Sequence, residues 1–327
     1  MTDEVLDAFT RIRHAAETHM DERDRGLLGW SEETVTEVCS HQGLPQVQVI
    51  PFNRNQEGKA VGADYLWWWL DKSSGVCFGM LVQAKRLEHV GNRWTVDIRH
   101  RNGEQLEDLY ATAKWLEVPA MYGVYTGGTV FRAELPCFHD DEPPCLSCRR
   151  MAVSVISAYQ LGAIWSPADT AATVFSESIP LEDLVDPQRS VGAVWDVNLE
   201  EIPPGPLRDF LVLDQDGPLE VAKRIFQAVC KQRSGAFSAA SAEAITLAGE
   251  ALFPEVPEDT GHFRGPYYRH FLQGLRTSAP DYVRDLQRWQ TPDDNMAYVI
   301  SAGQSGPARR PRALRGVGVD GVVLVTL

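Results

Sequence analysis

Three polar residues interrupt an apolar hairpin pattern in residues 62–87, and their types could support divalent-metal chemistry. Asp64 lies near the start of the segment GADYLWWWLDKSSGVCFGMLVQAKRL, and Gln83 and Lys85 lie near its end. A hard cation such as Mg²⁺ binds oxygen ligands and accepts a site with one or two carboxylates. Asp64, the Gln83 side-chain oxygen and the backbone carbonyl of Ala84 could supply such ligands. Lys85 could orient a water molecule or stabilise developing negative charge.

The hairpin pattern predicts where these side chains lie. Alternation along a strand places Gln83 and Lys85 on one face. A turn centred on Ser73 and Ser74 would place Asp64 opposite Gln83, with Cβ atoms about 5 Å apart. A slip of one residue would move Asp64 to the other face. The alternative interpretation of the pattern is an ordinary Asp–Lys ion pair in a partly buried hairpin.

Further candidates for the same centre come from the flanking segments. Ser31 is a good N-cap for a helix that we expect to end near Gly43, and Glu32 falls about 60° from the apolar position Val35 on its helical wheel. Glu32 is therefore our first choice for a supplementary acid. The other choices are Glu33 and Glu57, the latter in the loop before Asp64. Gln105, on a predicted helix at residues 103–118, either points back to the site or is solvated.

This combination of helix, strands and QAK motif resembles the PD-(D/E)xK, or restriction-endonuclease-like, nuclease superfamily over residues 28–126. The VQAKR sequence is similar to the Mrr-like variant of this superfamily, in which Gln replaces an acid. The chain also resembles an uncharacterised bacterial family with EExxTE, GADxxWW and QAKRL motifs. The resemblance implies a centre that uses Mg²⁺ or Mn²⁺ to hydrolyse nucleic-acid phosphodiesters, with Glu32, Asp64, Gln83 and Lys85 as its catalytic residues. Some nucleases of this broad type act in anti-phage defence.

Gln83 removes one negative charge from such a centre, which leaves a second interpretation open. The chain would then be a non-catalytic member of the same fold that binds nucleic acid or protein as a subunit of a defence or repair complex.

The remaining patterns predict a mixed α/β sheet flanked by helices, with an α-rich C-terminal extension. We expect residues 1–175 to form the nuclease-like core and residues 176–327 an accessory region, unless the chain is one continuous fold. The three consecutive tryptophans at 67–69 are expected to bury both faces of a central strand rather than to stack on bases. The expected helices are at residues 3–24, 151–164, 218–232 and 280–290, and the expected strands at 47–52, 95–98, 119–127 and 321–327.

A cysteine-rich loop at residues 137–148 has the spacing C-x-H-x5-C-x2-C. Thiolate and imidazole ligands this close together suit a tetrahedral structural Zn²⁺. The expected ligands are Cys137, His139, Cys145 and Cys148. The alternative is a reduced surface loop without metal.

Composition limits the partners. The chain has 327 residues, 44% of them hydrophobic, and a formal net charge of −14. No apolar run is long enough to span a bilayer, and we expect a cytoplasmic protein without a membrane partner. The net charge argues against a general polyanion-coating protein but allows a local basic surface. We expect Arg86, Arg99 and Arg101 to contact nucleic acid, most simply DNA, and the protein to form a homo-oligomer or to bind a defence-system partner.

Overall fold

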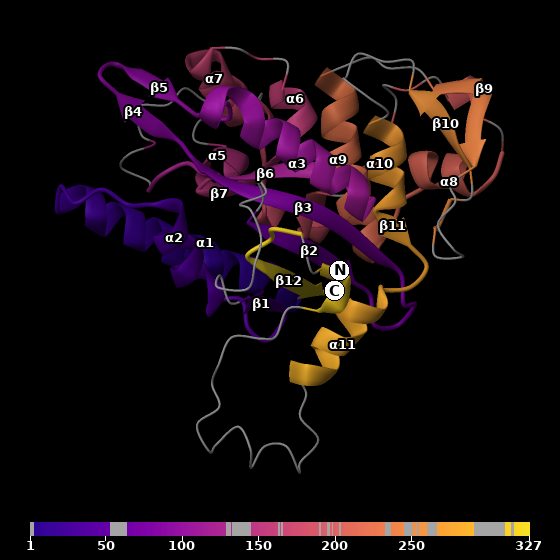
Figure 1. Ribbon diagram of the computed structural model, residues 1–327, viewed down its shortest axis with the longest axis horizontal. Helices are drawn as coiled ribbons and strands as arrows, with labels where there is room; N and C mark the ends of the chain where they lie inside the picture. Colours follow the sequence, from indigo (N-terminus) through magenta and orange to yellow (C-terminus); the bar gives the residue numbers. More distant parts are fainter. Residues whose placement is uncertain are drawn as a thin grey trace, which may run out of the picture.

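The main sheet takes its strands from both ends of the chain. A computed structural model describes the protein except for residues 1–2, 53–63, 129–131, 133–144, 163, 165, 190, 195–196, 198, 203, 233–236, 245–250, 254, 260–266, 291–310 and 315–316. Within the described part, eight strands form one sheet in the order β1-β12-β2-β3-β6-β7-β8, with β11 paired to β3 (Figure 1). These strands are β1 (Val47–Pro51), β2 (Tyr65–Leu70), β3 (Cys77–Arg86), β6 (Ala120–Tyr125), β7 (Val153–Ser157), β8 (Ile179–Pro180), β11 (Leu275–Arg276) and β12 (Gly321–Thr326).

Two small antiparallel pairs lie outside this sheet. They are β4 (Glu88–Val90) with β5 (Arg93–Thr95), and β9 (Phe237–Ala244) with β10 (Glu255–Asp259). The β4–β5 hairpin continues from β3 and projects from the body of the protein (Figure 1).

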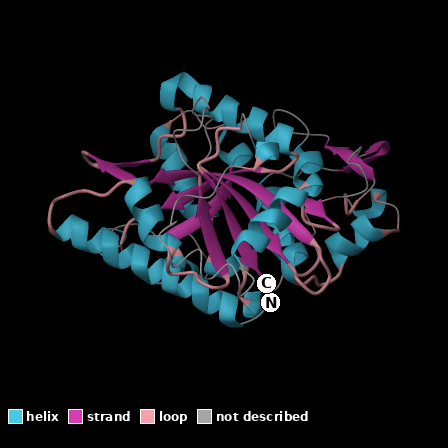
Figure 2. Cartoon of the chain, turned by 60° about the horizontal axis from the view of Figure 1, so that its bottom comes forward, coloured by secondary structure: helices cyan, strands magenta, loops and turns pink. Residues whose placement is uncertain are grey.

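Helices cover both faces of the main sheet (Figure 2). The helix α1 contacts one face through Phe9, whose ring centroid lies 5.6 Å from that of Trp69. The helix α3 lies on the opposite face, where it meets Lys85 through Gln105. The helices are α1 (Asp3–Arg25), α2 (Glu32–Ser40), α3 (Glu104–Leu116), α5 (Leu146–Arg150), α6 (Ala158–Gly162), α7 (Pro167–Glu177), α8 (Pro206–Val212), α9 (Gly217–Gln232), α10 (Tyr267–Gln273) and α11 (Asp281–Gln290).

The triple tryptophan buries both faces of β2, as predicted. Trp68 and Trp69 point to opposite sides, and each has an exposure of 1% or less. The Trp68 ring meets Tyr282 of α11 edge to face, and its Nε1 donates a 3.0 Å hydrogen bond to the Tyr282 hydroxyl. Burial of aromatic rings of this size contributes strongly to stability, so β2 is a firm platform for the residue that precedes it, Asp64.

The expected mixed α/β sheet flanked by helices is confirmed. The single helix expected at residues 151–164 is wrong, because this segment contains β7 followed by the short helix α6. A buried apolar run carries no periodicity that separates a strand from a helix. The strand expected at residues 95–98 is also wrong beyond Thr95, where β5 ends, and the helix expected to reach Gly43 ends at Ser40.

The main sheet draws strands from both sides of the boundary expected near residue 175. β8, β11 and β12 all follow that boundary, and β12 lies between β1 and β2. It pairs antiparallel with β1 and parallel with β2. The last strand of the chain is therefore part of the central sheet rather than an addition to its edge.

This position predicts that β12 contributes to the cooperative unfolding of the sheet. We expect Leu324→Ala, at a side chain with 2% exposure, to lower the free energy of unfolding by about 2–5 kcal/mol. Urea denaturation followed by tryptophan fluorescence would measure it. The control Leu213→Ala, at a side chain with 55% exposure, should change stability by less than about 0.5 kcal/mol. An unchanged main transition in Leu324→Ala would contradict a structural role of β12 in the sheet.

Candidate active site

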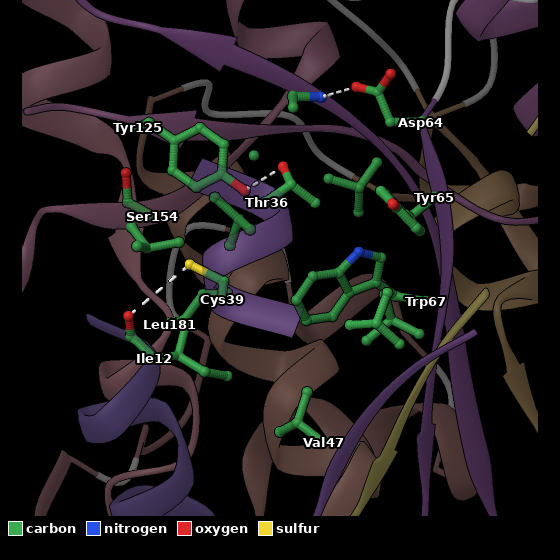
Figure 3. Close-up of a pocket in the computed structure, with 17 residues that line it drawn as sticks. Ile12, Thr36, Cys39, Val47, Asp64, Tyr65, Trp67, Tyr125, Ser154 and Leu181 are labelled. Atoms are coloured by element: carbon green, nitrogen blue, oxygen red, sulfur yellow. Dashed lines mark hydrogen bonds between the residues drawn. The ribbon is translucent and has the colours of Figure 1, made fainter. Parts of the chain in front are cut away.

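The β2–β3 hairpin has the predicted register and brings Asp64 to the end of β3. Tyr65 lies opposite Val82, and the Asp64 amide donates to the Val82 carbonyl at 3.1 Å. The Asp64 carboxylate contacts the residue that follows Gln83: its Oδ2 accepts a 2.5 Å hydrogen bond from the backbone amide of Ala84 (Figure 3). The carboxylate is thus fixed to the backbone of the strand that carries Gln83 and Lys85.

Lys85 is buried and points to α3. Its exposure is 8%, and its Nζ donates a 2.9 Å hydrogen bond to Gln105 Oε1. Of the two alternatives left open for Gln105, the structure shows the one in which it points back to this site. Asp64 and Lys85 form no ion pair with each other, although each is close enough to affect the pKa of the other. The alternative interpretation of the hairpin as an ordinary Asp–Lys ion pair is wrong.

Gln83 presents a buried oxygen that lacks a protein partner in the part of the chain that the structure describes. Its exposure is 3%, and its Oε1 accepts no hydrogen bond from a described residue. An unsatisfied buried polar atom costs about 1–3 kcal/mol. An oxygen left unpaired at a cleft beside a carboxylate is a suitable ligand for a hard cation.

A cleft of about 580 Å³ joins these side chains to α2. Glu32 is half-buried in it, whereas Glu33 and Glu37 are exposed at its border. The Ser31 hydroxyl caps the helix by accepting from the Thr34 amide, which places Glu32 in the first turn. The predicted orientation of Glu32 is confirmed, and Glu33 lines the same cleft from the outside. Glu57 lies outside the described residues.

A small apolar cavity of about 70 Å³ lies behind Asp64, between the sheet and α2 (Figure 3). Tyr65, Trp67 and Tyr125 line it, and the Tyr125 hydroxyl lies 2.7 Å from Thr36 Oγ1. These side chains keep water from one side of the Asp64 carboxylate.

Burial controls the charges at this end of β3. The pKa of Asp64 is raised to about 6, mainly by burial and less by the nearby Asp320 and Glu32, while the Ala84 hydrogen bond and Lys85 oppose the shift. Burial also raises the pKa of Glu32, although Lys85 and Arg86 oppose that shift. Burial lowers the pKa of Lys85, against the attraction of Glu32, Asp97 and Asp64. The fold thus holds both acids and the lysine in less charged states than water would.

Asp320 was not among the residues expected from the sequence. It directly precedes β12, and its amide donates a 2.7 Å hydrogen bond to the Asp64 carbonyl. It lines the same cleft as Asp64 and Gln83. The signal that could have found it is the pattern of an acid before an apolar strand, which DGVVLVTL shares with the segment that begins at Asp64.

The arginines expected to contact nucleic acid bond within the chain. Arg86 donates to the Trp30 carbonyl and pairs with Glu88. Arg99 donates to the carbonyls of Ile164 and Gly162, at 3.1 and 2.7 Å. The side chain of Arg101 lies outside the described residues. The contacts of Arg86 and Arg99 hold neighbouring loops in place.

The zinc prediction falls partly outside the described residues, which exclude Cys137 and His139. Cys145 and Cys148 are adjacent at the start of α5, where the Cys145 sulfur accepts from the Cys148 amide at 3.3 Å. Within the described ranges, no three His, Cys, Asp or Glu side chains are grouped closely enough to hold a metal ion. A structural zinc at this loop stays a prediction.

The donor set at the end of β3 fits a divalent cation better than a softer metal. Asp64 offers carboxylate oxygen and Gln83 an unpaired amide oxygen, and hard cations such as Mg²⁺ and Mn²⁺ prefer such atoms. Mg²⁺ gives up its water ligands reluctantly, so such an ion would keep several of them.

The chain belongs to a family of unknown function, DUF6615, whose model matches residues 5–310. No curated protein and no solved structure matches the chain. None of the helices that the structure describes is long and apolar enough to cross a membrane.

The raised pKa of Asp64 predicts that its ionised form lowers the free energy of unfolding, and that this effect depends on pH. As pH falls from 8 to 4, the folded protein binds a proton at Asp64 near pH 6, whereas the unfolded chain binds it only near the ordinary value of 3.8. In metal-free buffer, Asp64→Asn should therefore raise the free energy of unfolding by about 2–3 kcal/mol at pH 8, and by far less at pH 4.

Urea denaturation of both proteins at the two pH values would measure this difference. Asp285→Asn, which removes an exposed carboxylate on α11, is the control and should show little change at either pH. An equal effect of Asp64→Asn at pH 8 and pH 4 would contradict the ionisation proposed for this site.

Proposed function

We propose that this protein is a metal-dependent nuclease that hydrolyses nucleic-acid phosphodiester bonds with Asp64, Gln83 and Lys85 at its centre. The observation that carries the proposal is the buried, unpaired oxygen of Gln83, in a cleft that also contains the Asp64 carboxylate and the Lys85 amine. A purely structural hairpin would gain stability by pairing these groups with one another. Here the fold keeps them apart at a cleft.

The side chains suit separate tasks in such a reaction. Asp64 and Gln83 would hold Mg²⁺ or Mn²⁺, with Glu32 as a supplementary acid. When bound, the ion would polarise a phosphoryl oxygen and lower the pKa of a bound water. Gln105 holds the Lys85 amine at 2.9 Å, and from this position Lys85 would orient the attacking water or stabilise the negative charge that develops on the phosphate.

DNA is the substrate that we propose, and anti-phage defence is the proposed role. Both rest on the resemblance of the acid-led helix, the GAD strand and the strand ending in QAK to PD-(D/E)xK nucleases rather than on a contact in the fold. The proposed partner is a nucleic acid, together with a second copy of the chain or another defence protein.

A second candidate is a non-catalytic binding subunit of the same fold. The observation that favours it is the charge of the cleft, which is lined by five acids and, apart from Lys85, by no lysine or arginine among the described residues. These acids are Glu32, Glu33, Glu37, Asp64 and Asp320. Such a surface repels a polyanion unless cations are bound, and it would suit a basic protein partner.

Cleavage assays on plasmid, single-stranded DNA and RNA with Mg²⁺ or Mn²⁺ separate the two candidates. We expect cleavage by the wild-type protein and a fall of at least about 100-fold in Lys85→Met, because the variant loses a positive group positioned for the transition state. The matched control is Lys72→Met, at an exposed lysine in the turn of the same hairpin, which should cleave as the wild type does.

Two outcomes would count against the nuclease. In the first, the folded protein binds Mn²⁺ but cuts none of the substrates. In the second, a cleavage activity persists unchanged in both Lys85→Met and Asp64→Asn, which would identify a contaminating enzyme as its source.

A further inference from the structure

Asp320 stands beside Asp64 in the main sheet. β12 runs parallel to β2, with Gly321 opposite Tyr65, so the residues just before these two strands are neighbours. The 2.7 Å hydrogen bond from the Asp320 amide to the Asp64 carbonyl joins them directly. The two acids, 256 positions apart in the sequence, therefore enter the site through adjacent strands.

The side chain of Asp320 belongs to the same cleft as the proposed metal ligands. Asp320 is half-buried and lines the cleft together with Asp64 and Gln83. The cleft is also the place where Gln83, with 3% exposure, presents an oxygen without a hydrogen-bond partner among the described residues. A buried acceptor without a donor points independently to an electropositive ligand at this position.

The motif on β3 supplies too little negative charge for a divalent-cation site, and Asp320 can supply the rest. Sites for Mg²⁺ and Mn²⁺ commonly contain one or two carboxylates besides neutral oxygens and water. The motif on β3 carries an amide where an acid would supply the second negative charge. Asp320 restores that charge from a different strand, while Gln83 keeps a neutral oxygen in the same cleft.

We propose that Asp320 is the second carboxylate ligand of a divalent-cation site formed with Asp64 and Gln83, in place of the acid that β3 lacks. This inference rests on the proposed metal-dependent function. It makes the residue that directly precedes β12 part of the proposed active site.

Direct titration with Mn²⁺, in which electron paramagnetic resonance measures the free ion, tests the inference without an activity assay. We expect Asp320→Asn to weaken Mn²⁺ binding by at least about 10-fold, as Asp64→Asn does. The control Asp285→Asn removes the same charge from exposed α11 and should bind Mn²⁺ as the wild type does. Thermal unfolding without metal would establish that every variant is folded.

A rescue variant tests the proposed exchange of roles between Asp320 and Gln83. Gln83→Glu returns an acid to β3, so the double variant Gln83→Glu with Asp320→Asn should recover most of the Mn²⁺ affinity lost in Asp320→Asn. Gln83→Glu combined with Asp285→Asn supplies the baseline, because the added acid alone can tighten binding.

The outcomes distinguish this inference from the proposed nuclease. If Asp320→Asn binds Mn²⁺ as the wild type does while Asp64→Asn does not, Asp320 is no ligand. The inference then fails, but the proposed nuclease function is not contradicted. If Asp320→Asn loses Mn²⁺ and Gln83→Glu restores it, but no nucleic acid is cut, the ligand assignment stands and the nuclease fails. A wild-type protein that binds no Mn²⁺ overturns both.

Discussion

The hydrogen bond from the Ala84 amide to the Asp64 carboxylate is the contact on which the candidate site depends. It fixes an acid that precedes β2 to the strand that carries Gln83 and Lys85. The register of the hairpin determines it, because a slip of one residue would turn Asp64 to the other face of the sheet. The two buried tryptophans that follow Asp64 hold this register, because a slip would exchange their faces and break the contacts of Trp68 with Tyr282 and of Trp69 with Phe9.

The rest of the fold offsets an unfavourable arrangement of charges. Burial disfavours the ionised forms of Asp64, Glu32 and Lys85. The attraction between the acids and the lysine opposes these pKa shifts but does not cancel them. A site that leaves buried polar groups unpaired lowers stability unless packing elsewhere compensates. The sheet supplies this packing, because helices cover both of its faces and β12 closes the space between β1 and β2. The packing that this strand order provides thus compensates for the unfavourable burial of polar groups in the site.

The local part of this arrangement was predictable from sequence, and the non-local part was not. Alternation and the turn at Ser73–Ser74 predicted the pairing of Tyr65 with Val82, because both depend on neighbours in the chain. The orientation of Glu32 followed from helical periodicity, whereas the sequence left the orientation of Gln105 open. Asp320 could not be placed, because a parallel pairing between β2 and β12 leaves no periodic signal that links two distant segments. The expected helix at residues 151–164 was wrong for another reason: β7 and α6 are both buried, and a continuous apolar run does not mark their junction.

The acids of the cleft also bear on the order in which ligands can bind. Glu32 and Asp320 are close enough to Asp64 to raise its pKa and so to disfavour its ionised form. A polyanion that entered this cleft first would add negative charge to groups that already repel each other in a medium of low dielectric constant. Two arginines expected to contact nucleic acid have partners within the chain, because Arg86 pairs with Glu88 and Arg99 bonds to two backbone carbonyls. A divalent cation removes the obstacle, since it attracts the acids and the phosphate alike. Under the proposed function, metal binding is therefore a condition for nucleic-acid binding in the cleft as well as for the chemical step.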